Sequence, residues 1–256
     1  MMSASEASTR PAVRERILHL FRLPITDTFY GLDHCLRGGY KDLARIAFGL
    51  LVGWWIYVPI HELLHAFACM ATGGSVTRLE IDAIYGGHLL AGIFDWVSAG
   101  SDYAGQLVEF DTYGSDLIYL ATVFGPYLLT LFPGVWFLRF AASRNDGLLF
   151  GLSLPLALAP FLGLTGDAYE IGSILTSRVP PFHQAPLPEL LRGDDIFERY
   201  RNLPLDAPDS ALLGLILCAL LGALWALLTY ATGGALAKFL GNPPVPDPRT
   251  VPPSDR

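Results

Sequence analysis

Four long apolar stretches divide the sequence and limit the folds that it can adopt. A helix needs about 20 mostly apolar residues to cross a bilayer. The 256-residue chain is 52% hydrophobic and only 16% charged, whereas soluble domains carry about 25% charged residues. We therefore predict an all-α polytopic membrane protein with about four transmembrane helices. The stretches cover about residues 44–60, Leu117 to Leu138, Leu148 to Leu164 and Ala211 to Leu236.

The sequence outside these stretches divides the chain into three parts. Residues 1–45 form a basic segment in which residues 11–23 have amphipathic helical spacing. Such a helix either lies on the cytoplasmic membrane surface or caps the bundle as a short soluble helix. Residues 46–240 form the membrane domain, and the proline-rich residues 241–256 predict a disordered tail.

The two long connections differ from each other. Residues 76–81 and 106–110 favour strands, and a glycine-bracketed apolar piece covers residues 86–92. We predict a small sheet or re-entrant element there, next to the first membrane helix. The later connection predicts a short surface helix from Leu187 to Tyr200.

Small residues and cysteines are interpreted as packing groups. The three cysteines make no disulfide framework. The spacings Gly49-x-x-x-Gly53 and Gly147-x-x-x-Gly151 allow two helices to approach closely.

Basic residues gather on one side of the predicted topology. Twelve lie in the N-terminal segment, the connection after Leu138 and the tail, against five in the other two connections. The positive-inside rule then places both termini in the cytoplasm. No signal-peptide core precedes the first span, so that span is expected to direct insertion. We expect a multi-pass protein of a prokaryotic plasma membrane. Its expected partner is the lipid bilayer and not nucleic acid.

A metal-binding motif lies in the first apolar stretch. In His61-Glu62-Leu63-Leu64-His65, two histidines four residues apart share one helix face and can bind one zinc ion. The glutamate between them can accept a proton from water at the metal. Polar groups are costly at membrane depth, so they are functional-site candidates. We predict His61 and His65 as zinc ligands and Glu62 as the catalytic base.

A catalytic zinc site usually has a third protein ligand. Asp167 and Glu170 are the acids at the end of the third apolar stretch, which runs in the same direction as the first. Side chains late in both stretches reach the same depth. We predict Asp167 as the third ligand, with Glu170 as the alternative ligand or as a partner of the ligands.

Three motifs together resemble the site-2-type intramembrane zinc metalloproteases. In that family a transmembrane His-Glu-x-x-His precedes a β-prone stretch, the next helix carries a Gly-Pro element, and a later helix supplies an aspartate as third zinc ligand. The resemblance covers about residues 48–172 and implies zinc-dependent cleavage of a peptide bond. The matching segments are His61 to Ala68 with Gly73-Gly74-Ser75-Val76, then Phe124-Gly125-Pro126-Tyr127, and Pro160 followed by Asp167.

The chain departs from the family pattern in its last motif. The family has asparagine three residues before the proline, where this chain has Ala157. The family's Leu-Asp-Gly reads Gly166-Asp167-Ala168 here, at a longer spacing from Pro160. Family members also place the metal near the cytoplasmic face, whereas the distribution of basic residues places it nearer the opposite face.

The sequence favours an intramembrane zinc metalloprotease that acts on a membrane-protein or membrane-proximal peptide. Residues 76–81 could bind the substrate as an added strand. Tyr127, Thr165 and Tyr169 are candidate hydrogen-bond donors to the reacting carbonyl, and His88 is interpreted as a loop residue. Two alternatives stay open: a non-catalytic pseudoprotease subunit, and a metal-dependent enzyme that acts on lipid. Composition does not indicate the oligomeric state.

Overall fold

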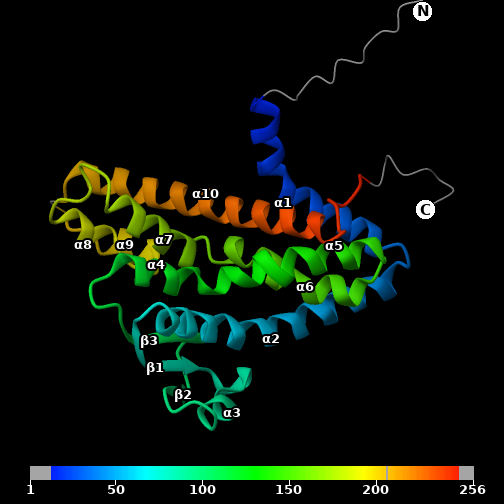
Figure 1. Ribbon diagram of the computed structural model, residues 1–256, viewed down its shortest axis with the longest axis horizontal. Helices are drawn as coiled ribbons and strands as arrows, with labels where there is room; N and C mark the ends of the chain where they lie inside the picture. The colour runs from blue at the N-terminus through cyan, green and yellow to red at the C-terminus, as the bar shows by residue number, and fades with distance from the viewer. Residues whose placement is uncertain (1–12, 206, 248–256) are drawn as a thin grey trace, which may run out of the picture.

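The computed structural model describes residues 13–205 and 207–247, and it is a helical bundle with one small sheet on its side (Figure 1). Four helical segments are long and apolar enough to cross a membrane, which confirms the predicted polytopic membrane fold. These segments are Tyr40–Ala71, Asp116–Ser143, Gly147–Thr176 and Asp209–Phe239. The helices are α1 (Val13–Cys35), α2 (Tyr40–Ala71), α3 (Gly87–Ala91), α4 (Asp116–Phe124), α5 (Val135–Ser143), α6 (Gly147–Leu162), α7 (Asp167–Thr176), α8 (Leu187–Leu191), α9 (Ile196–Arg201) and α10 (Asp209–Phe239).

The third span is longer than its apolar run predicts. Helix α6 ends at Leu162, residues 163–166 form a turn, and α7 continues the span from Asp167 to Thr176. Gly163 and Gly166 lie in this turn, in which the Ala168 N–H donates to the Gly163 carbonyl at 3.0 Å. The prediction took the glycines and Asp167 for the end of the span. They interrupt it instead, and Asp167 lies inside it.

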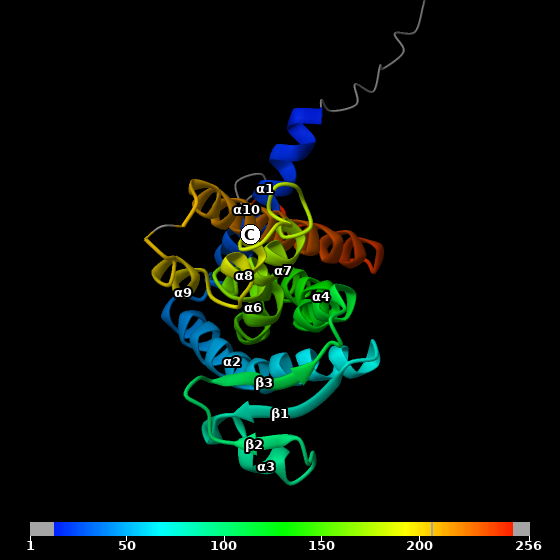
Figure 2. The same ribbon diagram turned by 90° about the vertical axis from the view of Figure 1, so that its left-hand side faces the viewer.

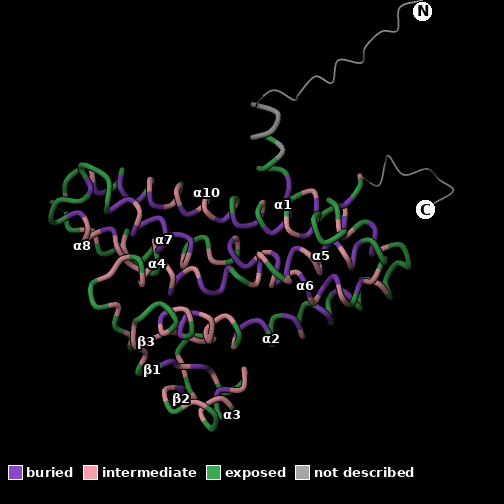
Figure 3. Tube along the Cα trace, viewed as in Figure 1, coloured by how far each residue is buried: buried purple, intermediate pink, exposed green. Residues whose placement is uncertain are grey.

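Glycines bring α2 and α6 into close contact, as the small-residue spacings predict. A Cβ atom at Gly53 would lie 2.6 Å from the Leu152 carbonyl oxygen, and Gly49 and Gly151 also face the backbone of the partner helix. Only glycine allows this approach, so the pair fixes the position of α2, which carries the histidine motif. The outer surfaces of the bundle stay exposed along the four spans (Figure 3), as expected for side chains that face lipid.

A buried ion pair joins α1 to the bundle. Arg139 on α5 is 2% exposed, and its Nη2 lies 2.8 Å from Asp27 of α1. The Tyr230 hydroxyl of α10 also donates to Asp27, at 3.1 Å. Because a buried charge is costly unless it is paired, these contacts secure α1 against α5 and α10. Helix α1 therefore extends beyond the predicted residues 11–23 and packs into the core over its second half.

The first part of the C-terminal tail is ordered, whereas the sequence predicts disorder from residue 241. The Val245 N–H donates to Asp27 at 3.1 Å, and the Val245 side chain is buried. Residues 248–256 lie outside the described residues.

Burial raises the pKa of the Cys35 thiol in α1 to about 12, so this cysteine packs as a neutral apolar group.

A three-stranded sheet lies along α2, where the β-prone runs predict it. Its order is β2 (Val97–Ala99), β1 (Ser75–Ile81), β3 (Gly105–Asp111), with β1 parallel to β2 and antiparallel to β3. Figure 2 shows β3 between β1 and the helices. The end of the sheet reaches back along α2, where the Trp55 indole donates to the Ile84 carbonyl at 2.6 Å. The turn after β1 therefore reaches the middle of the first span, and the sheet lies beside the second half of α2.

The late connection forms two short helices in place of the single predicted one. Helix α8 ends at Leu191 and α9 begins at Ile196. Asp195 separates them because its carboxylate caps α9, accepting from the Phe197 N–H at 2.7 Å. Helices α8 and α9 lie at one end of the bundle, and the α1–α2 turn, the end of α5 and the end of α10 lie at the other (Figure 1).

Candidate metal centre

The two histidines and the aspartate of the predicted metal site lie together. The Nε2 atoms of His61 and His65 are 3.1 Å apart. One Asp167 oxygen is 3.2 Å from His61 Nε2, and the other is 3.6 Å from His65 Nε2. All three ligand atoms fall within 4.8 Å of one another. Ligands about 2.0–2.2 Å from a tetrahedral zinc ion are roughly 3.3 Å apart, so this donor set fits zinc.

Each histidine is oriented by a hydrogen bond at its other ring nitrogen. His65 Nδ1 lies 2.9 Å from the Thr122 carbonyl oxygen of α4, which fixes Nδ1 as the protonated nitrogen. His61 Nδ1 lies 2.7 Å from the Tyr57 hydroxyl, one turn earlier on α2. Both rings therefore direct Nε2 toward Asp167, as metal-binding histidines are commonly held. Tyr57 is not among the site residues predicted from the sequence, although its spacing of four residues before His61 is a usable signal.

Glu62 lies beside the metal ligands and against the sheet. Its carboxylate is 4.0 Å from His61 Nε2, and its side chain is 14% exposed. A Cβ atom at Gly105 would lie 2.5 Å from Glu62 Cγ, so β3 can approach Glu62 only because residue 105 is glycine. This contact places the predicted base between the candidate metal site and the first residue of β3.

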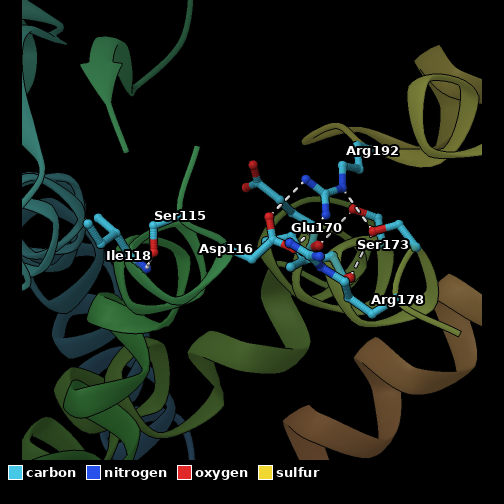
Figure 4. Close-up of polar contacts among 9 residues, drawn as sticks. Ser115, Asp116, Ile118, Glu170, Ser173, Arg178 and Arg192 are labelled. Carbon is cyan, nitrogen blue, oxygen red and sulfur yellow. Dashed lines mark hydrogen bonds and ion pairs between the residues drawn. The ribbon is translucent and has the colours of Figure 1, made fainter. Parts of the chain in front are cut away.

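An open cavity of about 620 Å³ gives access to these groups. Strand β3 forms one wall, and α4, α7 and the segment of residues 192–199 form the other. Figure 4 shows how that segment is attached: Arg192 donates to both oxygens of Asp116, at 3.0 and 2.7 Å. Arg178 binds the same carboxylate. Asp116 at the start of α4 thus fixes the far wall of the cavity.

Glu170 is not one of the candidate ligands in this arrangement. The metal-binding group contains Asp167 and the two histidines, whereas the Glu170 carboxylate accepts a hydrogen bond from the Tyr119 hydroxyl. Glu170 lies on the cavity wall, one helical turn beyond Asp167. The geometry therefore favours Asp167 over Glu170 as the third ligand.

The other polar candidates do not form part of the cavity wall. Tyr127, Thr165 and Tyr169 are not among the residues that line the cavity. The Tyr169 hydroxyl donates to the Leu191 carbonyl at 2.6 Å and supports the α8 connection. Their predicted interpretation as donors to the carbonyl therefore finds no support in the geometry. His88 lies on α3, at the far side of the sheet from the bundle, as a residue outside the site should.

The residues at two departures from the family pattern are buried away from the cavity. Ala157 is fully buried in the core that α5, α6 and α10 share and does not line the cavity. Ala168 is also fully buried, and Gly222 of α10 lies against its backbone. Both residues therefore contribute to helix packing and not to the cavity wall.

No family model matches the chain, and neither the curated proteins nor the solved structures include a match. The resemblance to site-2-type proteases consequently depends on the quoted motifs, and the function must be argued from the site.

Proposed function

We propose that the protein is an intramembrane zinc metallopeptidase. One observation supports this proposal above all. The ligand atoms of His61, His65 and Asp167 lie within 4.8 Å of one another, next to Glu62 and inside a bundle of candidate membrane spans. A purely structural role would gather four ionisable groups at membrane depth, which is costly even when they bond to one another and to nearby polar groups. A bound metal ion compensates for this cost.

The residues can divide the chemistry among themselves. His61, His65 and Asp167 would hold zinc, which supplies Lewis acidity toward a carbonyl and lowers the pKa of water when it is bound. Glu62 accepts the proton of the attacking water and returns it to the leaving amine. Tyr57 and the Thr122 carbonyl keep the imidazoles oriented throughout. The cavity beside β3 admits the peptide.

The substrate strand should pair with β3 and not with residues 76–81, which the sequence favours for this role. Those residues belong to β1, which has β2 on one side and β3 on the other. Strand β3 has β1 on one side and, in the described part of the chain, no strand on the other. That free edge lies at the cavity. An extended peptide added there would pass Glu62, because β3 begins at Gly105.

We expect Leu107→Pro to lower peptide cleavage roughly tenfold by removing a backbone donor from the free edge of β3. Leu107 pairs with Leu79, and the Leu79 N–H donates to the Trp96 carbonyl on the β2 side at 2.8 Å. Opposite residues of an antiparallel pair either both bond to each other or both face away, so the Leu107 N–H faces away from β1. Leu107→Ala is the matched control, because it shortens the same side chain and keeps the N–H. Equal cleavage rates for the two variants would contradict strand addition at β3.

Hydrolysis by the purified chain in lipid vesicles tests the proposed function. The vesicles would contain a mixture of single-span peptides, with products identified by mass spectrometry. Peptide cleavage that a zinc chelator stops and added zinc restores supports the proposal. Release of fatty acid from the vesicle lipid, with intact peptides, would favour the lipid-directed enzyme. Absence of both products from a zinc-loaded chain would favour the pseudoprotease.

We place the candidate metal centre nearer the outer face of the membrane. The α1–α2 turn, the α5–α6 connection and the end of α10 lie at one end of the bundle (Figure 1), and the sequence segments that contain them carry the excess of basic residues. Cysteines introduced at Ser101 and Ser143 on a cysteine-free background should react with impermeant probes from opposite sides, with position 101 outside. Labelling of position 101 from the cytoplasm alone would reverse the assignment.

A further inference from the structure

Glu170 is a buried acid for which the proposed chemistry has no use. It is 9% exposed and lies on the wall of the cavity that also contains Glu62 and the candidate ligands. One of its oxygens, Oε1, accepts a hydrogen bond from Tyr119. The second oxygen has no partner among the described residues, and it is not sealed from the cavity. A hydrogen-bond acceptor is therefore available from the cavity at this point.

No lysine or arginine within the described chain forms an ion pair with Glu170. Arg192, on the same cavity wall, is already bound to Asp116 and to the Ser177 hydroxyl. Arg199 also lines the cavity and interacts electrostatically with Glu170, but only at longer range than an ion pair. An unpaired buried carboxylate is unfavourable, and a cation that enters the cavity would relieve that cost. A cationic group of a ligand could therefore pair with Glu170.

The surroundings of Glu170 also favour a cation. Three further carboxylates line the cavity in the segment of residues 192–199, against the two arginines of that segment. Because Arg192 is held by Asp116, the balance of the remaining charges on this wall is negative. Such a wall attracts positively charged groups. The three carboxylates belong to Asp194, Asp195 and Glu198.

The position of Glu170 relates it to the bond that would be cut. It follows Asp167 by three residues on α7, a rise of about 4.5 Å. Successive residues of an extended peptide are about 3.3 Å apart. A side chain one or two residues from the scissile bond would therefore reach Glu170.

We infer that Glu170, held by Tyr119, forms a specificity subsite for a basic side chain next to the scissile bond of the substrate. The inference builds on the proposed peptidase function and adds the substrate class: peptides with lysine or arginine one or two positions from the cleavage point. Tyr119 is the positioning residue, since it fixes one carboxylate oxygen and leaves the other to the substrate.

Binding of peptidyl hydroxamates tests the subsite without any need for turnover, because a hydroxamate chelates zinc whether or not a peptide is hydrolysed. Two otherwise identical compounds carry lysine or norleucine beside the hydroxamate, in one series on the acyl side and in a second on the amine side. With the zinc-loaded full chain in detergent, lysine should bind about tenfold more tightly than norleucine in one series, as expected for a hydrogen bond to a charged group. In Glu170→Gln that ratio should fall to about one with zinc content unchanged.

Glu189→Gln is the matched control, because Glu189 is exposed on α8 and does not line the cavity. It should keep the preference for lysine. Equal binding of the two compounds to the parent chain in both series would overturn the subsite and leave the metal centre standing. Loss of zinc from Glu170→Gln would also overturn it, because Glu170 would then support the metal. If the parent bound neither zinc nor hydroxamate, the proposed function would fail, and the subsite with it.

Discussion

Glu62→Gln is expected to lower peptide hydrolysis by about 10²–10⁴-fold, the contribution usual for a positioned general base. The amide has nearly the shape of the carboxylate but cannot accept the proton of water. Glu62 is not one of the three candidate ligands, so the variant should bind as much zinc as the parent. The measurement is the initial rate of product formation, with zinc content determined on the same sample.

Glu109→Gln provides the control for this experiment. Glu109 lies on β3 close to the cavity wall, but its side chain is 55% exposed and pairs with Arg78. The same chemical change there should leave the rate within about twofold of the parent, as is usual for surface substitutions. A Glu62→Gln protein that cleaves at the parent rate would remove Glu62 from the mechanism.

Asp167→Ala is the second substitution with a large expected effect. Removing a direct ligand should weaken zinc binding by more than about 100-fold, beyond the 10–100-fold that loss of an outer partner costs. Glu170→Ala should keep zinc close to the parent level, because Glu170 contacts Tyr119 and not the ligands. Competition with a chelator of known affinity measures both constants. The opposite order of the two variants would make Glu170 the ligand.

The predicted convergence of the site followed from two facts visible in the sequence. The motif with His61 and His65 lies late in one apolar stretch, and Asp167 lies late in another that runs in the same direction. Depth in the bilayer constrains helices strongly, so side chains at equal depth can be matched without knowledge of the packing. The structure adds the turn at residues 163–166, which makes Asp167 the first residue of α7 and not the last part of the preceding helix.

Contacts between distant segments were beyond the reach of the sequence. Thr122 acts through its backbone carbonyl, which any residue would offer. The pairing of Asp27 with Arg139 joins residues more than one hundred positions apart, and nothing local in either segment indicates it. The alternation of β-prone residues locates strands but not their order, so it could not show that β1 is central and β3 is free at its edge.

Zinc content of the purified chain tests the account most directly. The parent should carry about one zinc ion per chain, and the double variant His61→Ala/His65→Ala should carry almost none, because one of three protein ligands cannot hold the ion. His183→Ala is the matched control, since His183 is exposed in the α7–α8 connection. It should retain the zinc of the parent. Stoichiometric zinc in the double variant, or a parent that takes up no zinc, would contradict the metal centre and the function proposed from it.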